Sequence, residues 1–307
     1  MKLSICIPTY NRCDFLLKNL VWIAGQIQKG HHSDIEIVVA DNASTDGTAD
    51  RVRQFIQATP DLKIKFITHS KNLGFDRNVL SAVAGAQGEY CWLMGDDDVL
   101  NEGALEKLIQ VFSDNPECVH VHVNYSRFDT SKGRVTAKRM IELKEDLFFN
   151  DPNEFYFYPL SKKSHFKLLG TNILTMSTNA FKRSAWNESL ADMELYMDRN
   201  MIHIFMLPKM AWLAQKTTKK PVIGLIAEPQ VQYLCMNHRP WNNDINADYS
   251  KFYYGQLESL GYSQSLLKNA REATRLESRG PSLIQPRHFK HPLRALKTLM
   301  GRLGITG

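Results

Sequence analysis

The stretch that decides the fold is NLGFDRNVLSAVAGAQGEYCWLMGDDDVL, residues 72–100. We expect a helix over Gly74–Ala86 and a buried strand over Tyr90–Met94, an alternation typical of α/β proteins. The strand runs into Gly95-Asp96-Asp97-Asp98. Three adjacent carboxylates repel one another and cost stability unless a cation or hydrogen-bond donors offset them. Either this run is a ligand site at a strand end, or it is a solvated acidic turn before a helix that begins near Glu102.

The same alternation precedes this stretch. Short apolar runs alternate with segments of helical periodicity, which is typical of βαβ units around a mainly parallel sheet. We expect strands over Leu3–Pro8, Ile35–Ala40 and Lys63–Thr68, and helices over Arg12–Gln28 and Thr48–Ala58. The pair Ser44 and Thr45 is the expected cap of the second of these helices.

The chain after residue 100 is patterned less regularly. We expect helices over Glu102–Phe112 and Met201–Leu213, strands over Cys118–Tyr125 and Val222–Ala227, and a hairpin around Lys132-Gly133. These elements predict a mixed second half without defining its topology.

The composition describes a globular protein with a basic end. The 307 residues are 43% hydrophobic and 23% charged, enough for a full core. The net charge is +6, yet six basic and no acidic residues follow position 278, which leaves 32 of each sign before it. A neutral body argues against a nucleic-acid partner. From Pro292 the sequence predicts a short basic amphipathic helix, which binds an anionic membrane surface or packs on the body or on a second protomer.

Cysteine use and hydropathy predict the compartment. The five cysteines form no CxxC pair and leave one over, which favours a reducing cytoplasm over a disulfide framework or a zinc ribbon. The apolar run at the start is too short for a secretory signal, and no stretch reaches the roughly 18 apolar residues of a spanning helix. We therefore expect a cytoplasmic protein whose membrane contact is peripheral, on the inner face of the cytoplasmic membrane.

Polar residues follow three of the predicted strands. Ligands bind beyond the carboxyl ends of strands in open α/β sheets, and these ends carry Pro8–Asn11, Asp41–Thr48 and Gly95–Asp98. Oxygen ligands suit Mn²⁺ or Mg²⁺, which one or two carboxylates and substrate phosphates commonly hold. A phosphate loop is not supported, because the glycines at Walker spacing, Gly25 and Gly30, precede histidines and no GxGxxG follows the first strand.

Three ordered motifs resemble a known family. ICIPTYNR, VVADNASTDGT and NLGFDRNVLSAVAGAQGEYCWLMGDDDVL are together similar to family 2 glycosyltransferases of the GT-A fold, and most similar to bacterial O-antigen and capsule enzymes of abequosyltransferase type. The resemblance covers roughly residues 1–125. It implies a Rossmann-like, mainly parallel sheet flanked by helices, and a donor that is a nucleoside-diphosphate sugar.

The resemblance also implies roles for the first two strand ends. In the family the end of the first strand lines the base pocket, and here it consists of Pro8, Thr9 and Asn11. Asp41 matches the aspartate that hydrogen-bonds the base, and Ser44 stands beside it.

The resemblance implies further roles within residues 72–100, the stretch quoted first. Arg77 matches a basic residue near the base and ribose, Asp96 the carboxylate near the ribose, and Asp97 the carboxylate that binds the metal, with Asp98 a second candidate ligand. The usual pattern is Asp-x-Asp-Asp, whereas Gly95 stands first here. The division of ribose and metal binding among the three aspartates therefore stays open.

The general base is the least defined part of the site. Inverting members use an Asp or Glu at the start of a helix after the sheet, often in a Glu-Asp pair, to take the proton of the acceptor hydroxyl. The comparable stretch, SLADMELYMDRNMIHIFML (189–207), has no such pair. Asp198 and His203 are equal candidates, the histidine because its ordinary pKa lies near neutrality. Each is equally compatible with an ordinary helix residue.

A later loop, NHRPWNN (237–243), could fold over the donor. His238 could bind the metal, and Arg239 could grip the diphosphate with two hydrogen bonds. The alternative is an ordinary proline turn on the surface.

The sequence thus predicts a metal-dependent, inverting GT-A glycosyltransferase of bacterial surface-polysaccharide synthesis, with a glycan acceptor linked to polyprenyl diphosphate. We expect a nucleotide-sugar-binding half over residues 1–125, an acceptor-side half with a lid over 126–280, and a proline-containing linker with a basic tail over 281–307. The alternatives are a sugar nucleotidyltransferase and a catalytically silent nucleotide-sugar-binding scaffold.

Overall fold

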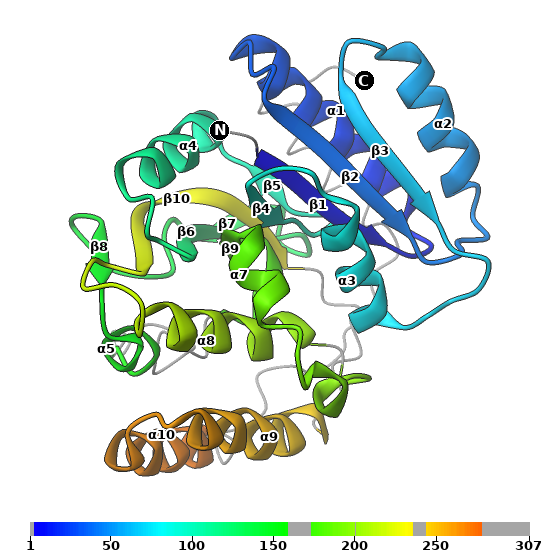
Figure 1. The fold of residues 1–307 in the computed structure, drawn as a ribbon. Coiled ribbons are helices and arrows are strands. Elements are labelled where there is room, and N and C mark those ends of the chain that lie inside the picture. The colour runs from blue at the N-terminus through cyan, green and yellow to red at the C-terminus, as the bar shows by residue number, and fades with distance from the viewer. Residues whose placement is uncertain (1–2, 159–172, 200, 236–243, 278–307) are drawn as a thin grey trace.

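The computed structural model describes residues 3–158, 173–199, 201–235 and 244–277, and Figure 1 shows a central sheet with helices on both faces. The ten strands described follow the order β3-β2-β1-β4-β9-β6-β10-β5, with β7 paired to β6 and β8 to β10. The expected α/β class with a mainly parallel central sheet flanked by helices is confirmed.

The first four strands are parallel and alternate with helices. The strands are β1 (Leu3–Thr9), β2 (Ile35–Asp41), β3 (Lys63–Thr68) and β4 (Tyr90–Leu93), and the helices between them are α1 (Cys13–Lys29), α2 (Thr48–Ala58) and α3 (Phe75–Gly85). All seven residues of β1 are buried, because helices cover both faces of the sheet, and the strand is accordingly mostly apolar. Thr9 pairs with Asp41, and Asp41 pairs with Thr68, so the carboxyl ends of these strands are level.

The second half completes the same sheet with mixed strands. These are β5 (Val99–Leu100), β6 (His120–Asp129), β7 (Arg134–Ala137), β8 (Leu147–Phe149), β9 (Asn179–Lys182) and β10 (Ile223–Cys235). Strand β9 is antiparallel to both β4 and β6, and so joins the two halves. Strand β10 is parallel to β6. The boundary expected near residue 125 falls inside β6.

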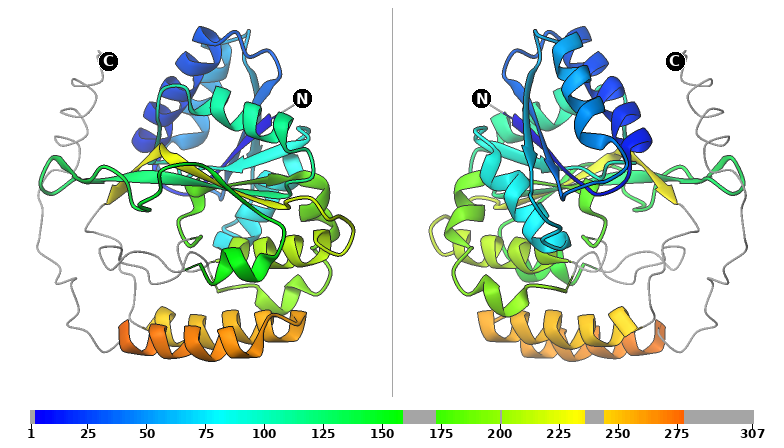
Figure 2. Two further views of the ribbon diagram at one scale, coloured as in Figure 1. Left: turned by 90° about the vertical axis from the view of Figure 1, so that its left-hand side faces the viewer. Right: turned by 90° about the vertical axis from the view of Figure 1, so that its right-hand side faces the viewer.

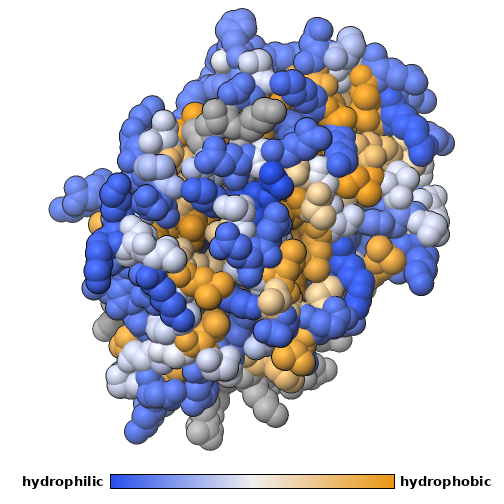
Figure 3. Space-filling view, viewed as in Figure 1, coloured by the Kyte–Doolittle hydropathy of each residue, from blue (hydrophilic) through white to orange (hydrophobic). Residues whose placement is uncertain are grey.

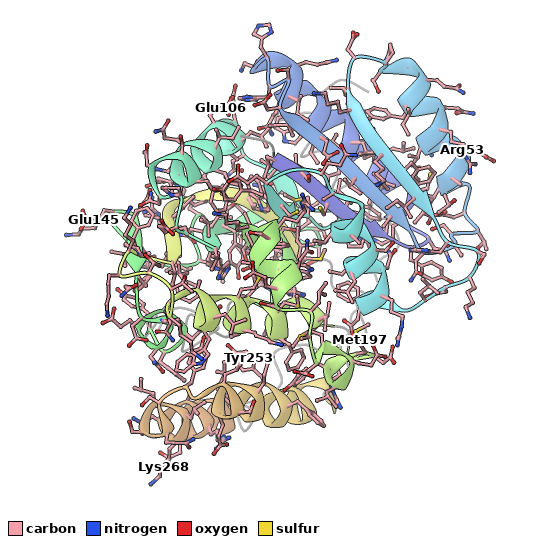
Figure 4. All side chains as sticks on the ribbon, viewed as in Figure 1. Arg53, Glu106, Glu145, Met197, Tyr253 and Lys268 are labelled. Carbon is pink, nitrogen blue, oxygen red and sulfur yellow. The ribbon has the colours of Figure 1, made fainter. Side chains whose placement is uncertain are left out.

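Helices cover the sheet in layers (Figure 2). One face carries α1, α2 and α4 (Ala104–Asp114), and the other carries α3, α5 (Pro152–Tyr156), α7 (Arg183–Glu188) and α8 (Ile202–Ala214). Beyond α8 lie α9 (Asp244–Leu260) and α10 (Gln264–Glu277) as an outer layer. Tyr253 of α9 is buried between α8 and α9 (Figure 4). Each sheet face therefore has its own apolar core.

Most predicted elements are confirmed within two residues, but one cap is wrong. Ser44 and Thr45 do not cap α2, whose first residue follows Gly47 in a left-handed conformation (φ 84°). Asp46 instead accepts hydrogen bonds from the Thr48 amide and hydroxyl. Strand β10 is longer than the predicted Val222–Ala227, because the chain continues past a register shift between Ile226 and Val231.

The surface of the described residues is mixed. Figure 3 shows a largely hydrophilic face on which apolar residues form separate groups. Among the helices described, none has the length and apolar character needed to cross a membrane. The predicted basic tail, residues 281–307, lies outside the described residues.

Candidate active site

The predicted base pocket is assembled from the ends of β1 and β2. The Asn11 amide donates to Ser44 Oγ (2.8 Å), and the Thr45 amide donates to Asn11 Oδ1 (2.7 Å). Asp41 Oδ1 accepts from the Ser44 amide (3.2 Å) and from the Ser44 hydroxyl. Three of the predicted donor-binding residues are therefore in direct contact. Pro8 and Thr9 lie at the end of β1, which pairs with β2 here.

This pocket holds two residues in an uncommon backbone conformation. Asn11 has φ 52° and Ala43 has φ 60°, in the left-handed region that side chains other than glycine seldom adopt. The Asn11–Ser44–Thr45 hydrogen bonds fix the two turns against each other. Such strain is typical of functional sites, where the surrounding structure holds it.

Buried amides tie these strand ends to α3. Asn78 Nδ2 donates to the carbonyls of Thr9 (3.2 Å) and Ala40 (3.0 Å). Asn42 Nδ2 donates to Asn72 Oδ1 (2.8 Å) and to the Gly74 carbonyl (3.2 Å). These asparagines lie within the quoted motifs VVADNASTDGT and NLGFDRNVLSAVAGAQGEYCWLMGDDDVL, but no role was predicted for them. They set the position of α3 relative to the pocket.

The acidic run after β4 is buried, with 5%, 5% and 4% of Asp96, Asp97 and Asp98 exposed. Asp96 accepts from Thr9 Oγ1 (2.9 Å) and from Arg12 Nε (2.7 Å). Arg12 also ion-pairs with Asp97 Oδ2. Burial and the charge of Asp97 raise the pKa of Asp96 to about 6, against the opposing effect of Arg12. This is therefore a desolvated anionic site and not a solvated acidic turn.

Arg12 is the residue of this site that the sequence analysis missed. It ends the motif ICIPTYNR and directly precedes α1. The signal was a basic residue at a strand end that faces three carboxylates in the predicted sheet. Its guanidinium also stacks over Phe15, 4.7 Å from the ring centroid, a cation–π contact that supports the side chain.

Asp98 is bound by groups from the second half of the chain. Ser177 Oγ donates to Asp98 Oδ2, and the Leu234 amide donates to Asp98 Oδ1 (3.1 Å). The Gly95 amide donates to Ser177 Oγ (2.8 Å). The acidic run is thus attached to β10 and to the turn before β9.

The same contacts explain why glycine occupies position 95. A Cβ atom there would lie 3.0 Å from Asp98 Oδ2, 3.2 Å from Asp97 Oδ1 and 3.3 Å from Ser177 Oγ. An aspartate at this position, as in the usual family pattern, would add a carboxylate to an already anionic cluster. The departure from the pattern is therefore matched by the packing around it.

The donor set at Asp96 and Asp97 fits a divalent cation. Two desolvated carboxylates already share one positive group, the Arg12 guanidinium, and oxygen donors suit Mg²⁺ and Mn²⁺. Within the described ranges, no three His, Cys, Asp or Glu side chains converge so as to hold a metal by themselves. An ion bound here would need substrate oxygens as well, as is common for Mg²⁺.

Arg77 joins α3 to the stretch that was expected to supply the base. Its guanidinium donates to Asp198 Oδ1 (2.7 Å) and to Glu194 Oε1 (2.9 Å). The Asp198 side chain is 69% exposed, and its backbone is left-handed (φ 63°). A Cβ atom on Gly74, at the start of α3, would lie 3.8 Å from Asp198 Oδ1. Asp198 thus lies at the amino-terminal end of α3, which Asn42 links to β2.

Asp76 holds the start of α8 in place. Its buried carboxylate accepts from the amides of Arg199 (2.8 Å) and Ile202 (2.9 Å). The Ile202 amide is one that an α-helix leaves unpaired at its amino terminus, and Arg199 lies in the segment before the helix. Asp76 stands beside Arg77 in the NLGFDRN motif, and the sequence analysis did not single it out. The segment carrying Asp198 is therefore fixed to α3 on both sides.

His203, the other candidate base, lies inside the core. The residue is 1% exposed, and its Nε2 donates to the Leu174 carbonyl (3.2 Å). Its Nδ1 atom has no hydrogen-bond partner among the described residues. Burial lowers the pKa of His203 to about 4, although the backbone carbonyls oppose this shift. The remaining candidates, His238 and Arg239, lie outside the described residues.

The layered sheet, with polar side chains at the carboxyl ends of its parallel strands, is an α/β architecture of the kind that binds ligands at this edge. The family model "Glycosyl transferase family 2" matches residues 4–189, so the chain belongs to this family. The match includes β1 to β4 and the acidic run. The family predicted from the three motifs is confirmed.

Curated relatives are similar over part of the chain. Abequosyltransferase RfbV of Salmonella typhimurium is 39% identical over 121 residues, 39% of this chain and 35% of that protein. GalNAc(5)-diNAcBac-PP-undecaprenol beta-1,3-glucosyltransferase of Campylobacter jejuni is 35% identical over 109 residues, 36% of this chain and 34% of that protein. The chain thus matches about a third of the length of each relative.

The fold is similar to that of a solved structure along nearly the whole chain. The match is to residues 1–349 of TarS from S. aureus in complex with UDP-GlcNAc, with a TM-score of 0.65 and 15% identity. It covers 99% of this chain and 80% of that one. At this identity the likeness shows the fold, and the GT-A architecture expected from the sequence is confirmed.

Proposed function

We propose that the protein transfers a sugar from a nucleoside-diphosphate sugar to a glycan acceptor in bacterial polysaccharide synthesis. The observation that carries the proposal is the buried pair Asp96 and Asp97 at the strand edge where Asn11, Asp41 and Ser44 are joined. This edge offers hydrogen-bonding groups for a base and anionic groups for a cation bound to diphosphate. Family membership and the names of the two relatives support the same reaction class.

The donor would lie across the carboxyl ends of β1, β2 and β4. Pro8, Thr9, Asn11, Asp41 and Ser44 would surround the base, and Asp96 would accept from the ribose. Arg77 lies in the first turn of α3, where its guanidinium donates to Asp198 and Glu194. We assign it a contact near the base and ribose.

A divalent cation, Mn²⁺ or Mg²⁺, would be held by Asp97 together with the donor diphosphate. When bound it supplies a Lewis acid that stabilises the negative charge of the leaving diphosphate. Asp98 would orient this carboxylate, because its own oxygens bind Ser177 and the Leu234 amide. His238 and Arg239 stay candidates for further contacts to the metal and the diphosphate.

The acceptor hydroxyl needs a base, and we assign that role to Asp198. A base must reach the hydroxyl directly or through one water molecule, and the Asp198 side chain is 69% exposed whereas His203 is 1% exposed. Asp198 would remove the hydroxyl proton while the oxygen attacks the anomeric carbon opposite the leaving diphosphate. The product would then have inverted configuration.

The acceptor would be a glycan linked to polyprenyl diphosphate at the inner face of the cytoplasmic membrane. The support is the Campylobacter relative, whose name specifies an undecaprenol-linked glycan. The six basic residues that follow position 278 suit an anionic surface.

The test is turnover of a panel of nucleoside-diphosphate sugars with Mn²⁺, with EDTA as the control. We expect metal-dependent release of nucleoside diphosphate that rises when lipid-linked glycan is added. Formation of nucleoside triphosphate from added pyrophosphate would identify a nucleotidyltransferase instead, and binding without turnover would identify a silent scaffold.

The base assignment is tested by Asp198→Asn and His203→Ala. We expect the first to lower kcat by about 10²–10⁴-fold, the usual contribution of a general base, and the second to act mainly on stability. If both variants keep near wild-type kcat, neither residue is the base.

A further inference from the structure

The guanidinium of Arg12 bridges the first two carboxylates of the acidic run. Its Nε donates to Asp96 Oδ1 (2.7 Å), and a terminal nitrogen pairs with Asp97 Oδ2. One cation thus bridges two consecutive buried carboxylates. The oxygens it holds belong to the same two side chains that the proposed function assigns to ribose and metal.

This bridge is more than a surface ion pair. The side chains of Asp96 and Asp97 are 7% and 2% exposed, against 27% for Arg12. Desolvated carboxylates left without a cation would repel each other strongly. The donor-free protein therefore needs a positive group at this place, and Arg12 supplies it from within the chain.

The backbone and the side chain of Arg12 are held by different groups. Its backbone directly precedes α1, where the Cys13 amide is held by Asp46 Oδ2 (2.9 Å). The guanidinium rests on Phe15, whose ring packs with the apolar residues Val99, Phe128 and Leu234. The Arg12 side chain is 27% exposed, so a change of its ion-pair partner would require no rearrangement of the apolar core.

We propose that Arg12 is the counter-cation of Asp97 in the donor-free protein. It releases Asp97 when the metal–diphosphate group binds, and then contacts the diphosphate. The proposal rests on the proposed function, because it assumes that this group binds here. Two cations on one carboxylate oxygen repel each other, so Arg12 and a divalent ion compete for Asp97 in the donor-free protein. A guanidinium binds phosphate with two parallel hydrogen bonds, so Arg12 gains a partner when the diphosphate arrives.

The consequence is coupled binding of metal and nucleotide. Without nucleotide, a divalent ion has to displace Arg12 and finds no phosphate oxygens to replace the lost ion pair. With nucleoside diphosphate, the displaced guanidinium pairs with phosphate. Each ligand therefore raises the affinity of the protein for the other, and the effect is reciprocal.

The experiment measures Mn²⁺ binding by electron paramagnetic resonance, for wild type and Arg12→Gln, first with Mn²⁺ alone. We expect Arg12→Gln to bind Mn²⁺ at least about tenfold more tightly than wild type, the size expected for one charge-assisted hydrogen bond. The titration is then repeated with whichever of UDP, GDP, CDP and dTDP binds wild type. We expect nucleotide to tighten Mn²⁺ binding strongly in wild type and only weakly in Arg12→Gln.

The matched control is Arg51→Gln. Arg51 lies on α2 and pairs with Asp14 near the start of α1 (2.7 Å), with half of its side chain exposed. The variant loses the same charge close to the same helix without touching the acidic run. We expect its Mn²⁺ binding to match wild type. Arg12→Lys keeps the charge but cannot bridge the two carboxylates, and its affinity for Mn²⁺ should lie between those of wild type and Arg12→Gln. This variant keeps the test valid even if Arg12→Gln folds poorly.

Equal Mn²⁺ affinity in wild type and both Arg12 variants would overturn the proposal. So would equal tightening by Arg12→Gln and Arg51→Gln, since this would be an effect of net charge alone. If wild type binds no nucleoside diphosphate with Mn²⁺, the proposed function fails, whereas failure of the Arg12 proposal leaves nucleotide binding by wild type intact.

Discussion

The β1–β4 half and the β6–β10 half share one sheet but use their polar residues in opposite ways. In the first half, polar groups gather at strand ends, where Ser44 is hydrogen-bonded to both Asn11 and Asp41. In the second half they lie inside the core, where Asn179 Oδ1 accepts from His120 Nε2 and His122 Nδ1 (both 3.1 Å). The strand-end groups of the first half are those that the proposed function assigns to the donor, whereas the polar groups within the strands of the second half bind one another and the scaffold.

The two halves meet at the turn before β9. Asn179 Nδ2 donates to the carbonyls of Ile173 (3.0 Å) and Thr175 (2.9 Å). Ser177 of the same turn contacts Asp98 and Gly95. The buried amide of Asn179 thus holds this turn in place, and the turn orients the acidic run. A comparison of variants in the two halves can therefore separate effects on ligand binding from effects on the stability of the sheet.

The largest effect is expected from the first half. Asp97→Asn should lower kcat/KM for sugar transfer by about 10³-fold, because it weakens a metal site worth several kcal/mol in the transition state. Thermal stability should change little, since the amide keeps the shape of the side chain. Asp61→Asn, an exposed acid far from the acidic run in sequence, is the control and should match wild type. Unchanged turnover of Asp97→Asn would contradict the assignment of the metal site to this edge of the sheet.

Asn179→Ala is the corresponding change in the second half. It removes the acceptor of two buried imidazoles and the donor to two carbonyls. We expect the free energy of unfolding to fall by about 3 kcal/mol, since each buried polar group left unpaired costs roughly 1–3 kcal/mol. Urea unfolding measures the loss.

The control for Asn179→Ala is Asn115→Ala, whose amide donates only to the Val111 carbonyl at the end of α4. It should cost less than about 1 kcal/mol. Equal losses in the two variants would mean that the buried cluster does not support the sheet.

Gly95→Ala tests the contact between the halves. The added Cβ would lie 3.0 Å from Asp98 Oδ2, so we expect a loss of about 1–2 kcal/mol in unfolding free energy and weaker binding of Mn²⁺ with nucleotide. Gly25→Ala in α1 has open space around the new methyl, and should stabilise the protein by about 0.5–1 kcal/mol through helix propensity. A stabilising Gly95→Ala would show that the acidic run has room for a side chain.

Three buried imidazoles also make the unfolding free energy depend on pH. Burial lowers the pKa values of His120 to about 3, with a contribution from the charge of His122, and those of His122 and His203 to about 4. Below pH 6.5 the unfolded chain takes up protons at these sites that the folded chain does not. The unfolding free energy therefore falls as pH drops from 6.5 towards 4, by up to about 1.4 kcal/mol per pH unit for each histidine.

Asp96 opposes part of this effect, because its raised pKa of about 6 makes the folded chain take up a proton first between pH 6 and 4. The net dependence should therefore be that of about two histidines. Urea unfolding between pH 7.5 and 5 measures it, and His122→Gln should reduce the slope while the exposed His31→Asn should not. A flat profile for wild type would contradict the assignment of neutral, buried imidazoles.

The sequence predicted the first half closely because its information is local. Strand and helix periods alternate there, and Lys63–Thr68 and Thr48–Ala58 match their predicted bounds. Asn11, Asp41 and Ser44 could be placed together because parallel strands end at one edge. The GT-A class followed from the same motifs.

The remainder depends on contacts between distant residues. Strand β9 exists as the partner of β4 and β6, and Asn179 meets His122 across 57 residues. Arg12 meets Asp96 across 84 residues, and Asp76 meets the Ile202 amide across 126. No periodicity within one segment reports such pairs. For the same reason the sequence could not separate Asp98, which binds the scaffold, from Asp97.

The most direct test of the strand-edge site is calorimetric titration of UDP, GDP, CDP and dTDP into wild type and Asp41→Asn, each with and without Mn²⁺. We predict that one nucleotide binds wild type, that Mn²⁺ strengthens its binding at least about tenfold, and that Asp41→Asn weakens it by about 1–3 kcal/mol through loss of a charged hydrogen bond. Nucleotide binding that is indifferent to both Mn²⁺ and Asp41, or no binding of any nucleotide, would contradict the account.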